Sequence, residues 1–339
     1  MQNKLLQLCL GGTLVMATLP AQAASALDYE ASQPFIEKMQ TQHGFNPRQL
    51  TGLLGQSRIR DDILKVIARP AEKKPWHQYR PIFVTPARVK GGLAFWDKHE
   101  AILGRAEQEY GVPSEIIVAI IGVETRYGKH TGRYRVIDAL STLAFAYPPR
   151  SAFFTSELEH YLLMTREEQV DPLTLKGSYA GAMGQPQFIS SSFRSFAVDF
   201  DADGKRDIWN NPADAIGSVA NYFHRHGWRN GEPIAARINT SGVTDETLLE
   251  SKTLKPSLSL AEFQAKGVEA IPGDFNPELL STLIGLEQEE DREYWLGLHN
   301  FYVITRYNHS ALYAMAVYQL SQEIKAQREA MLNNVASDN

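Results

Sequence analysis

One glutamate at the end of an apolar stretch is the residue of this sequence best suited to acid–base chemistry. Glu124 follows eight positions, Ile116 to Val123, of which seven are apolar. Apolar surroundings penalise an ionised carboxyl group, so they raise its pKa. A carboxylic acid that stays protonated near neutral pH can serve as a general acid. We therefore predict that Glu124 is catalytic; the alternative is a helix-end glutamate that turns outward or pairs with Arg126 or Lys129.

An acidic loop over residues 199–214 has the spacing of a calcium-binding EF-hand loop. Aspartates stand at positions 1, 3 and 5 of that pattern, and Gly204 stands at position 6, where the backbone turns sharply. The predicted ligands are Asp199, Asp201, Asp203, the backbone carbonyl of Lys205, and Asp214. Asn210 replaces the usual last glutamate, so Asp214 would supply the missing carboxylate. The alternative is a solvated turn, but aspartates at alternate positions repel one another without a cation, so we predict structural calcium.

The segment from Val112 to Lys129 must position Glu124. Pro113 suits the first turn of a helix, and the apolar residues that follow face every side of that helix. We therefore expect a helix that is buried on most sides and that Gly128 can end in the left-handed conformation.

The rest of the chain predicts a mainly α (α+β) protein with a small sheet. Helical patterns cover residues 33–40, 48–54, 61–68, 87–110, 136–145, 151–169, 190 onward, 215–226, 244–250, 259–266 and 310–328. Strand patterns cover residues 233–238, 279–286 and 294–298, and an acidic turn at 287–292 joins the last two into a hairpin. Residues 70–86, rich in proline and aromatic side chains, predict an extended strap.

The first 23 residues have the features of an export signal. Lys4 precedes a mostly apolar run, and Ala21-Gln22-Ala23 is a cleavage site of the A-x-A type. We expect a soluble periplasmic protein, with an outer-membrane lipoprotein attached through Cys9 as the alternative. Cys9 is the only cysteine of the chain, so the mature protein would have neither a disulfide nor thiol chemistry.

Composition limits the class of partner. The 339 residues, 43% of them hydrophobic, can bury a large core, and a net charge of -5 argues against a nucleic acid partner. Tyrosines and amides beside loops or helix ends would suit a glycan, whose sugar rings offer apolar faces and hydroxyls. These residues are Tyr79, Tyr222, Tyr302, Tyr307, Tyr313, Gln185 and Gln187. Each one alone is more often part of a core, so they are informative only together with Glu124.

Four long motifs resemble the lytic murein transglycosylase B family, glycoside hydrolase family 103. They are VETRYG at 123–128, GSYAGAMGQPQF at 177–188, the stretch at 201–228 that begins DADGKRDIW, and NFYVITRYNHS at 300–310. The resemblance covers roughly residues 30–325. It implies a goose-lysozyme-like catalytic core, a helical domain, a small domain with a β-sheet, and an EF-hand-like calcium loop.

The resemblance also implies roles for single residues. Glu124 matches the single catalytic glutamate. Ser178 matches a serine near that glutamate and would take part in catalysis by orienting Glu124 or the substrate's acetamido group. The positions implied for substrate binding are Tyr79, Arg150, Gln187, Tyr222, Tyr307, Asn308 and Tyr313. The chain departs from the family at Pro186, where a glycine is common, and at Pro149, where a second arginine is common.

The expected organisation follows from the resemblance and the patterns together. Residues 1–23 form the signal, 24–105 a helical domain, 106–230 the catalytic core with its loop at 199–214, 231–299 a small α/β insertion, 300–330 the rest of the core, and 331–339 a disordered tail.

The implied activity is cleavage of the bond between N-acetylmuramic acid and N-acetylglucosamine in peptidoglycan, leaving 1,6-anhydro ends. Most glycosidases use two carboxylates, but Glu124 could act alone if the substrate's acetamido group assists. No cofactor would be needed for catalysis. We expect a monomer that acts on glycan strands and can join wall-synthesis proteins. The alternatives are a hydrolytic muramidase, which would release reducing ends, and a non-catalytic wall-binding module.

Overall fold

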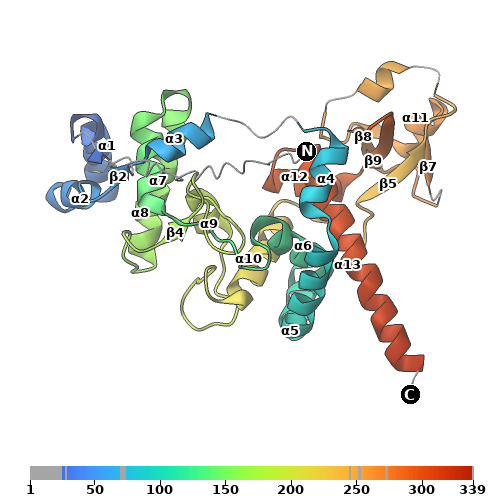
Figure 1. Ribbon diagram of the computed structural model, residues 1–339, viewed down its shortest axis with the longest axis horizontal. Helices are drawn as coiled ribbons and strands as arrows, with labels where there is room; N and C mark the ends of the chain where they lie inside the picture. The colour runs from blue at the N-terminus through green and yellow to red at the C-terminus, as the bar shows by residue number, and fades with distance from the viewer. Residues whose placement is uncertain are drawn as a thin grey trace, which may run out of the picture.

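Helices make up most of the protein, and a five-stranded sheet lies at one end (Figure 1). The computed structural model describes residues 25–26, 29–68, 74–243, 246–250, 253–271 and 274–337. The helices are α1 (Tyr29–His43), α2 (Pro47–Leu54), α3 (Asp61–Ile67), α4 (Trp76–Phe83), α5 (Pro86–Tyr110), α6 (Ser114–Thr125), α7 (Val136–Ala146), α8 (Ser151–Glu167), α9 (Ser190–Phe196), α10 (Pro212–Arg225), α11 (Leu260–Ala265), α12 (His299–Tyr307) and α13 (Ala311–Ser337), with 3-10 helices η1 (Pro148–Arg150) and η2 (Glu246–Glu250). The strands are β1 (Ser25–Ala26), β2 (Arg58–Ile59), β3 (Tyr134–Arg135), β4 (Lys176–Gly177), β5 (Ala235–Asn239), β6 (Leu258–Ser259), β7 (Glu269–Ile271), β8 (Leu280–Glu287) and β9 (Arg292–Gly297). The predicted class, mainly helical with a small sheet, is confirmed.

Helix α6 is the most deeply enclosed element of the helical part. Every one of its residues is described, and every one except Glu124 is buried. α5, α10 and α13 pack around it, so the prediction of a helix buried on most sides is confirmed. Gly128 adopts the expected left-handed conformation (φ 81°), but the expected position of the helix end is wrong. The helix stops at Thr125, because Arg126 (φ 50°) and Tyr127 (φ 61°) are already left-handed.

The ring of Tyr127 explains this early end. It lies against glycines of α5 and α6, where a Cβ atom at Gly91 would come within 2.7 Å of the ring and one at Gly122 within 2.6 Å of its hydroxyl. The hydroxyl donates a hydrogen bond to the backbone oxygen of Arg88 at 2.7 Å. Packing between two helices therefore holds Tyr127 in a backbone conformation that is unusual for a side chain of its size.

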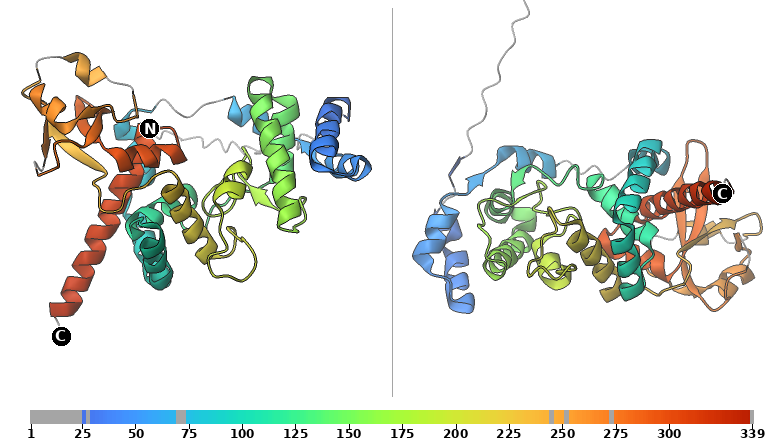
Figure 2. Two further views of the ribbon diagram at one scale, coloured as in Figure 1. Left: turned by 180° about the vertical axis from the view of Figure 1, so that it is seen from behind. Right: turned by 90° about the horizontal axis from the view of Figure 1, so that it is seen from below.

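The larger sheet has the strand order β6-β8-β9-β5-β7, and all its neighbours are antiparallel. β8 and β9 form the predicted hairpin, with Glu287 opposite Arg292 beside the acidic turn. A separate small core, which includes Phe263, Leu283 and Leu296, fills the space between the sheet and α11. Seen from below, the sheet and the pair α1–α2 lie at opposite ends of the molecule (Figure 2).

The expected N-terminal helical domain over residues 24–105 is divided between two regions. β2 and α3 contact α7, whereas α4 contacts α13 and α5 contacts α6. Figure 1 shows the same division, with α1 to α3 on the side of α7 and α8. The stretch at 87–110 therefore belongs with α6, because its apolar residues complete the core around that helix.

Three further expectations differ from the structure. The expected strap at 70–86 contains the helix α4, whose Trp76 is buried, so apolar packing stabilises a helix despite the internal Pro81. α13 continues to Ser337 instead of ending near residue 328, so most of the tail expected to be disordered is helical. Of the helix expected at 244–250, the described residues form the 3-10 helix η2.

The export signal predicted for residues 1–23, with Cys9, lies outside the described residues. None of the described helices combines the length and the apolar character needed to cross a membrane.

Candidate active site

Glu124 lies at the C-terminal end of α6, where its side chain is partly exposed although the rest of the helix is buried. The surrounding protein atoms desolvate the carboxyl group and raise its pKa to about 7, while a hydrogen bond from Tyr313 opposes the rise. Among the described residues, no second carboxylate contributes to this shift. Near neutral pH the carboxyl group is thus present in both protonation states. A group that first acts as an acid and then as a base needs both of these states.

Two tyrosines from separate helices interact with this carboxyl group, and a third interacts with one of them. Tyr313, buried on α13, donates a hydrogen bond of 2.5 Å to Oε1 of Glu124. Burial and then the charge of Glu124 raise the pKa of both Tyr313 and Tyr307, so both hydroxyls lie in the field of the carboxylate. Tyr79 on α4 also acts on Tyr313, and its ring stacks on Trp76 with a centroid distance of 6.3 Å. The structure therefore brings together three of the tyrosines predicted from the sequence.

Tyr307 is held in place by rings and by the backbone of a loop. Its hydroxyl donates to the carbonyl oxygen of Pro186 at 2.6 Å, and its ring lies 5.9 Å from that of Phe188. Tyr222, which is buried, packs against Tyr307 with centroids 4.7 Å apart and donates its hydroxyl to the carbonyl of Arg306. Tyr222 thus packs behind Tyr307 within the protein. The predicted contact of Tyr222 with substrate stays a prediction.

The small-residue loop at 177–188 stabilises itself through two of the predicted residues. The Ser178 hydroxyl accepts hydrogen bonds from the N–H groups of Ala180 (3.3 Å) and Ala182 (3.0 Å). Gln187, with φ 54°, donates from Nε2 to the carbonyl oxygens of Gly184 (2.9 Å) and Thr131 (3.1 Å). The predicted actions of Ser178 on Glu124 and of Gln187 on the glycan stay predictions.

Arg150 and Asn308 are exposed and come from different parts of the chain. Arg150 ends η1, and its guanidinium lies over the ring of Phe153 at 4.4 Å. Asn308 directly follows α12. Both side chains are accessible to a large ligand.

Sequence reasoning missed Thr125, the residue that joins the end of α6 to the loop. Its hydroxyl lies 3.0 Å from the carbonyl oxygen of Gln185 and accepts a hydrogen bond from the N–H of Gly128, also at 3.0 Å. Thr125 therefore ties both sides of the site together next to Glu124. The sequence signal for Thr125 was its position directly after the candidate catalytic Glu124, at the end of a predicted helix. Asp138, fourteen residues after Glu124, is paired with Arg135 at 2.7 Å.

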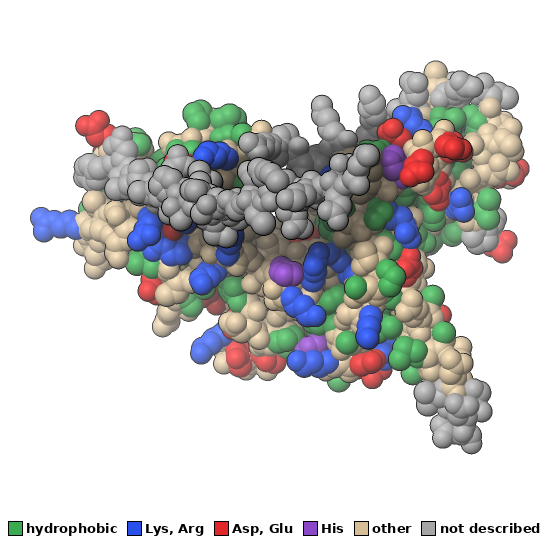
Figure 3. All heavy atoms as spheres, viewed as in Figure 1, with side chains coloured by type: hydrophobic (Ala, Val, Ile, Leu, Met, Phe, Trp, Pro, Cys, Tyr) green, Lys and Arg blue, Asp and Glu red, His purple; other side chains and the backbone are tan. Residues whose placement is uncertain are grey.

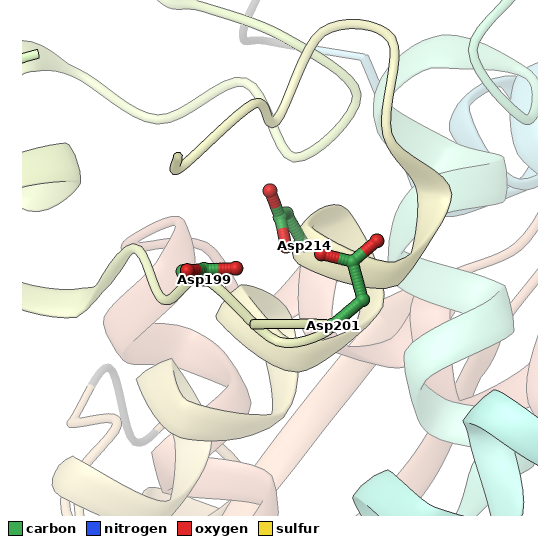
Figure 4. A group of neighbouring side chains, drawn as sticks. All are labelled: Asp199, Asp201 and Asp214. Atoms are coloured by element: carbon green, nitrogen blue, oxygen red, sulfur yellow. The ribbon is translucent and has the colours of Figure 1, made fainter. Parts of the chain in front are cut away.

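The acidic loop brings three carboxylates together beside the first turn of α10 (Figure 4). One oxygen from each of Asp199, Asp201 and Asp214 lies within 4.8 Å of the others. Asp214 is fully buried, and burial together with the charges of Asp201 and Asp199 raises its pKa. Its carboxylate also accepts hydrogen bonds from the N–H groups of Phe200 (2.8 Å) and Asp207 (2.7 Å), which close the loop.

This donor set fits calcium. Ca²⁺ prefers carboxylate and carbonyl oxygens, and a buried carboxylate beside two others is destabilised unless a cation neutralises them. Asp203 lies outside the convergent group, and its carboxylate accepts a hydrogen bond from the N–H of Lys205 at 2.9 Å. Ligation by Asp203 and by the carbonyl of Lys205 stays a prediction.

Known proteins share both the sequence and this architecture. Residues 28–322 match the transglycosylase SLT domain family. The chain is 46% identical over 309 residues to membrane-bound lytic murein transglycosylase B of Escherichia coli (strain K12), which covers 88% of this chain and 83% of that protein. The soluble lytic transglycosylase SltB1 from Pseudomonas aeruginosa has a TM-score of 0.83 at 51% identity, over 88% of this chain and 99% of that one. The Escherichia coli lytic transglycosylase Slt35 in complex with calcium has a TM-score of 0.82 at 44% identity, over 90% and 96% of the two chains.

Proposed function

This chain belongs to the transglycosylase SLT domain family and is a lytic murein transglycosylase, and we propose that Glu124 is the acid and the base of its reaction on peptidoglycan. The observation that carries the proposal is the partly exposed carboxyl of Glu124, whose pKa burial raises to about 7. The hydrogen bond from Tyr313 fixes its orientation.

In the first step, protonated Glu124 donates its proton to the oxygen that links N-acetylmuramic acid to N-acetylglucosamine. The bond from C1 of the muramic sugar to that oxygen breaks, and the N-acetylglucosamine leaves with a free hydroxyl. The carbonyl oxygen of the 2-acetamido group bonds to C1, as in the substrate-assisted glycosidases. Glu124 is then ionised.

In the second step, ionised Glu124 removes the proton from the 6-hydroxyl of the same muramic sugar. The 6-oxygen bonds to C1 while the bond from C1 to the acetamido oxygen breaks. The product is a 1,6-anhydromuramic end, water is not consumed, and Glu124 returns to its protonated form. One group that both gives and takes a proton needs a pKa near the working pH, which matches the rise at Glu124.

Replacing Glu124 by glutamine tests this assignment, because the amide keeps the shape but cannot transfer the proton. We expect loss of anhydromuramic products from purified peptidoglycan, measured by mass analysis of the fragments. Glu115→Gln, in the same helix but paired with Lys325 on α13, is the matched control and should retain them. Anhydro products from Glu124→Gln would refute the assignment.

The same fragments separate the rival functions. A hydrolytic muramidase would give reducing ends that are heavier by one water, and a non-catalytic wall-binding module would leave sacculi turbid while still binding them. The residues that we assign to binding the glycan and its substituents are Tyr79, Arg150, Gln187, Tyr222, Tyr307, Asn308 and Tyr313. Ser178 would orient Glu124 or the acetamido group.

Structural calcium in the acidic loop is part of the proposal. It is supported by the convergence of Asp199, Asp201 and Asp214 and by the calcium complex of the relative Slt35. The ion would neutralise these carboxylates and fix the loop ahead of α10. We also propose export to the periplasm, where peptidoglycan lies, with residues 1–23 as the signal.

A further inference from the structure

A hollow of about 500 Å³ lies between the end of α4, the start of α5 and the residues that follow α6. Four basic side chains line it: Arg88, Arg126, Lys129 and His130. Figure 3 shows Lys and Arg side chains, with a histidine, gathered near the middle of the molecule over α6. The sequence patterns and motifs assign none of these four residues to a ligand.

The cations of this hollow are not neutralised by the protein. Within the described part of the chain, Arg88, Arg126 and Lys129 form no ion pair with a carboxylate. Arg88 is only 8% exposed, and its guanidinium lies over the ring of Phe83 at 5.3 Å. Among the described residues, the guanidinium makes one hydrogen bond, a long one of 3.5 Å to the carbonyl oxygen of Val123. Burial and the nearby charge of Arg126 lower the pKa of Arg88, so the two cations repel each other. A buried guanidinium with unused donors favours an anionic ligand.

We infer that this hollow is a subsite for the carboxylates of the peptide stem that the muramic sugar carries. The inference rests on the proposed function, since it places the glycan at Glu124. The sugar backbone of peptidoglycan is neutral, whereas the stem ends in a carboxylate and has further carboxylates along it. Guanidinium and ammonium groups bind carboxylates, and the planar guanidinium can do so through two parallel hydrogen bonds.

The hollow lies within reach of such a stem. Arg126 is two residues from Glu124, which corresponds to at most about 7 Å of main chain. An extended stem of five residues spans at most about 17 Å. A stem attached to a muramic sugar at Glu124 can therefore bring a carboxylate to Arg126 and Lys129.

Binding to three defined probes tests the subsite. The probes are the disaccharide of N-acetylglucosamine and N-acetylmuramic acid with a pentapeptide, the same compound with its carboxylates converted to amides, and the disaccharide without peptide. Calorimetry is done in a Glu124→Gln background, so turnover is not required. Arg126→Ala with Lys129→Ala should weaken binding of the first probe about fivefold to tenfold, as expected for two exposed ion pairs. Binding of the other two should not change.

Two control variants show whether the loss of affinity comes from the charge of the side chains, from their shape, or from a charge anywhere on the surface. Arg126→Lys with Lys129→Arg keeps both charges and should retain most of the affinity. Lys98→Ala removes an exposed charge of α5 outside the hollow and should have no effect. Arg88 is left unchanged because it also contacts the end of α6.

A loss that is equal for all three probes, a loss shared by Lys98→Ala, or no loss at all would overturn the subsite. The proposed function is judged separately, by the anhydro products of the unmodified enzyme. A selective loss of binding therefore supports the subsite even if Glu124 proves not to be the catalytic residue.

Discussion

The hydroxyl of Tyr313 on α13 donates a hydrogen bond of 2.5 Å to Oε1 of Glu124 on α6, across a separation of 189 residues. The donor opposes the rise that burial causes in the pKa of Glu124, so the value of about 7 is a balance between two environments. Because α13 packs directly on α6, this contact is built into the central helix pair. The acid strength of the site therefore depends on two segments that lie far apart in the sequence.

Removing the Tyr313 hydroxyl should make Glu124 a weaker acid. In Tyr313→Phe, Glu124 loses the hydrogen bond that lowers its pKa, so this pKa should rise. The alkaline limb of the pH profile of kcat/KM should therefore move to higher pH. We also expect turnover to fall by about tenfold, because the carboxyl group is no longer held in one orientation. The measurement is a pH profile of anhydromuramic product release.

Tyr318→Phe is the control for that profile. Tyr318 lies on the same helix but donates its hydroxyl to the carbonyl of Ala235 at 3.4 Å. The alkaline limb of the Tyr318→Phe profile should coincide with that of the parent enzyme. If the alkaline limb of Tyr313→Phe also coincides with that of the parent, the hydrogen bond does not affect the pKa of Glu124.

The raised pKa of Glu124 should lower the stability of the protein at neutral pH. Folding raises the pKa from 4.5 to about 7, so the folded state binds the proton more tightly than the unfolded chain. The contribution of this group to the free energy of unfolding is complete below the unfolded pKa and is lost as pH rises through about 7. Glu124→Gln cannot ionise, so it should be more stable than the parent by about 3 kcal/mol at about pH 8.

Urea unfolding at two pH values checks this linkage. Near pH 4 the parent and Glu124→Gln should have nearly equal stability, because the parent carboxyl is then protonated in both states. A difference that stays constant between about pH 4 and about pH 8 would mean that ionisation of Glu124 has no effect on folding.

Calcium should stabilise the fold without entering the reaction. At a calcium concentration of a hundred times Kd, the free energy of unfolding should rise by about 2.7 kcal/mol, and chelation should remove that gain. Asp201→Asn weakens the convergent carboxylate group and should reduce the calcium-dependent rise in Tm. Asp291→Asn, an exposed aspartate of the β8–β9 turn, should leave it intact. A Tm that is independent of calcium would argue against the ion.

A methyl group at Gly122 should disturb the end of α6. Its Cβ would lie 2.6 Å from the Tyr127 hydroxyl, so the ring would have to move and the left-handed turn after Thr125 would lose its support. We expect Gly122→Ala to lower the free energy of unfolding by about 1–3 kcal/mol. Gly104→Ala in α5 is the control, because a Cβ there meets open space, and it should be neutral or stabilising by up to about 1 kcal/mol. Equal stability of the two variants would contradict this explanation.

The sequence by itself determined the features that depend on local pattern. The apolar run before Glu124 predicted a buried helix with a desolvated acid at its end, because helical periodicity and burial of apolar side chains act on consecutive residues. Asp199 and Asp201 predicted a loop with neighbouring carboxylates, and two strand patterns around an acidic turn predicted the β8–β9 hairpin. The four family motifs predicted the class of enzyme.

Only the tertiary structure decided which side chains meet. The residues next to Tyr313 in the sequence do not predict its contact with Glu124. The residues next to Tyr127 do not predict that its ring packs against Gly91 and Gly92 of α5. The end of α6 was misplaced because packing of the Tyr127 ring, and not the intrinsic preference of Gly128, sets the backbone there. The cationic hollow also arises only when α4, α5 and the end of α6 come together. Contacts between distant segments depend on how helices pack, and local periodicity fixes which face of a helix is buried but not which residue it faces.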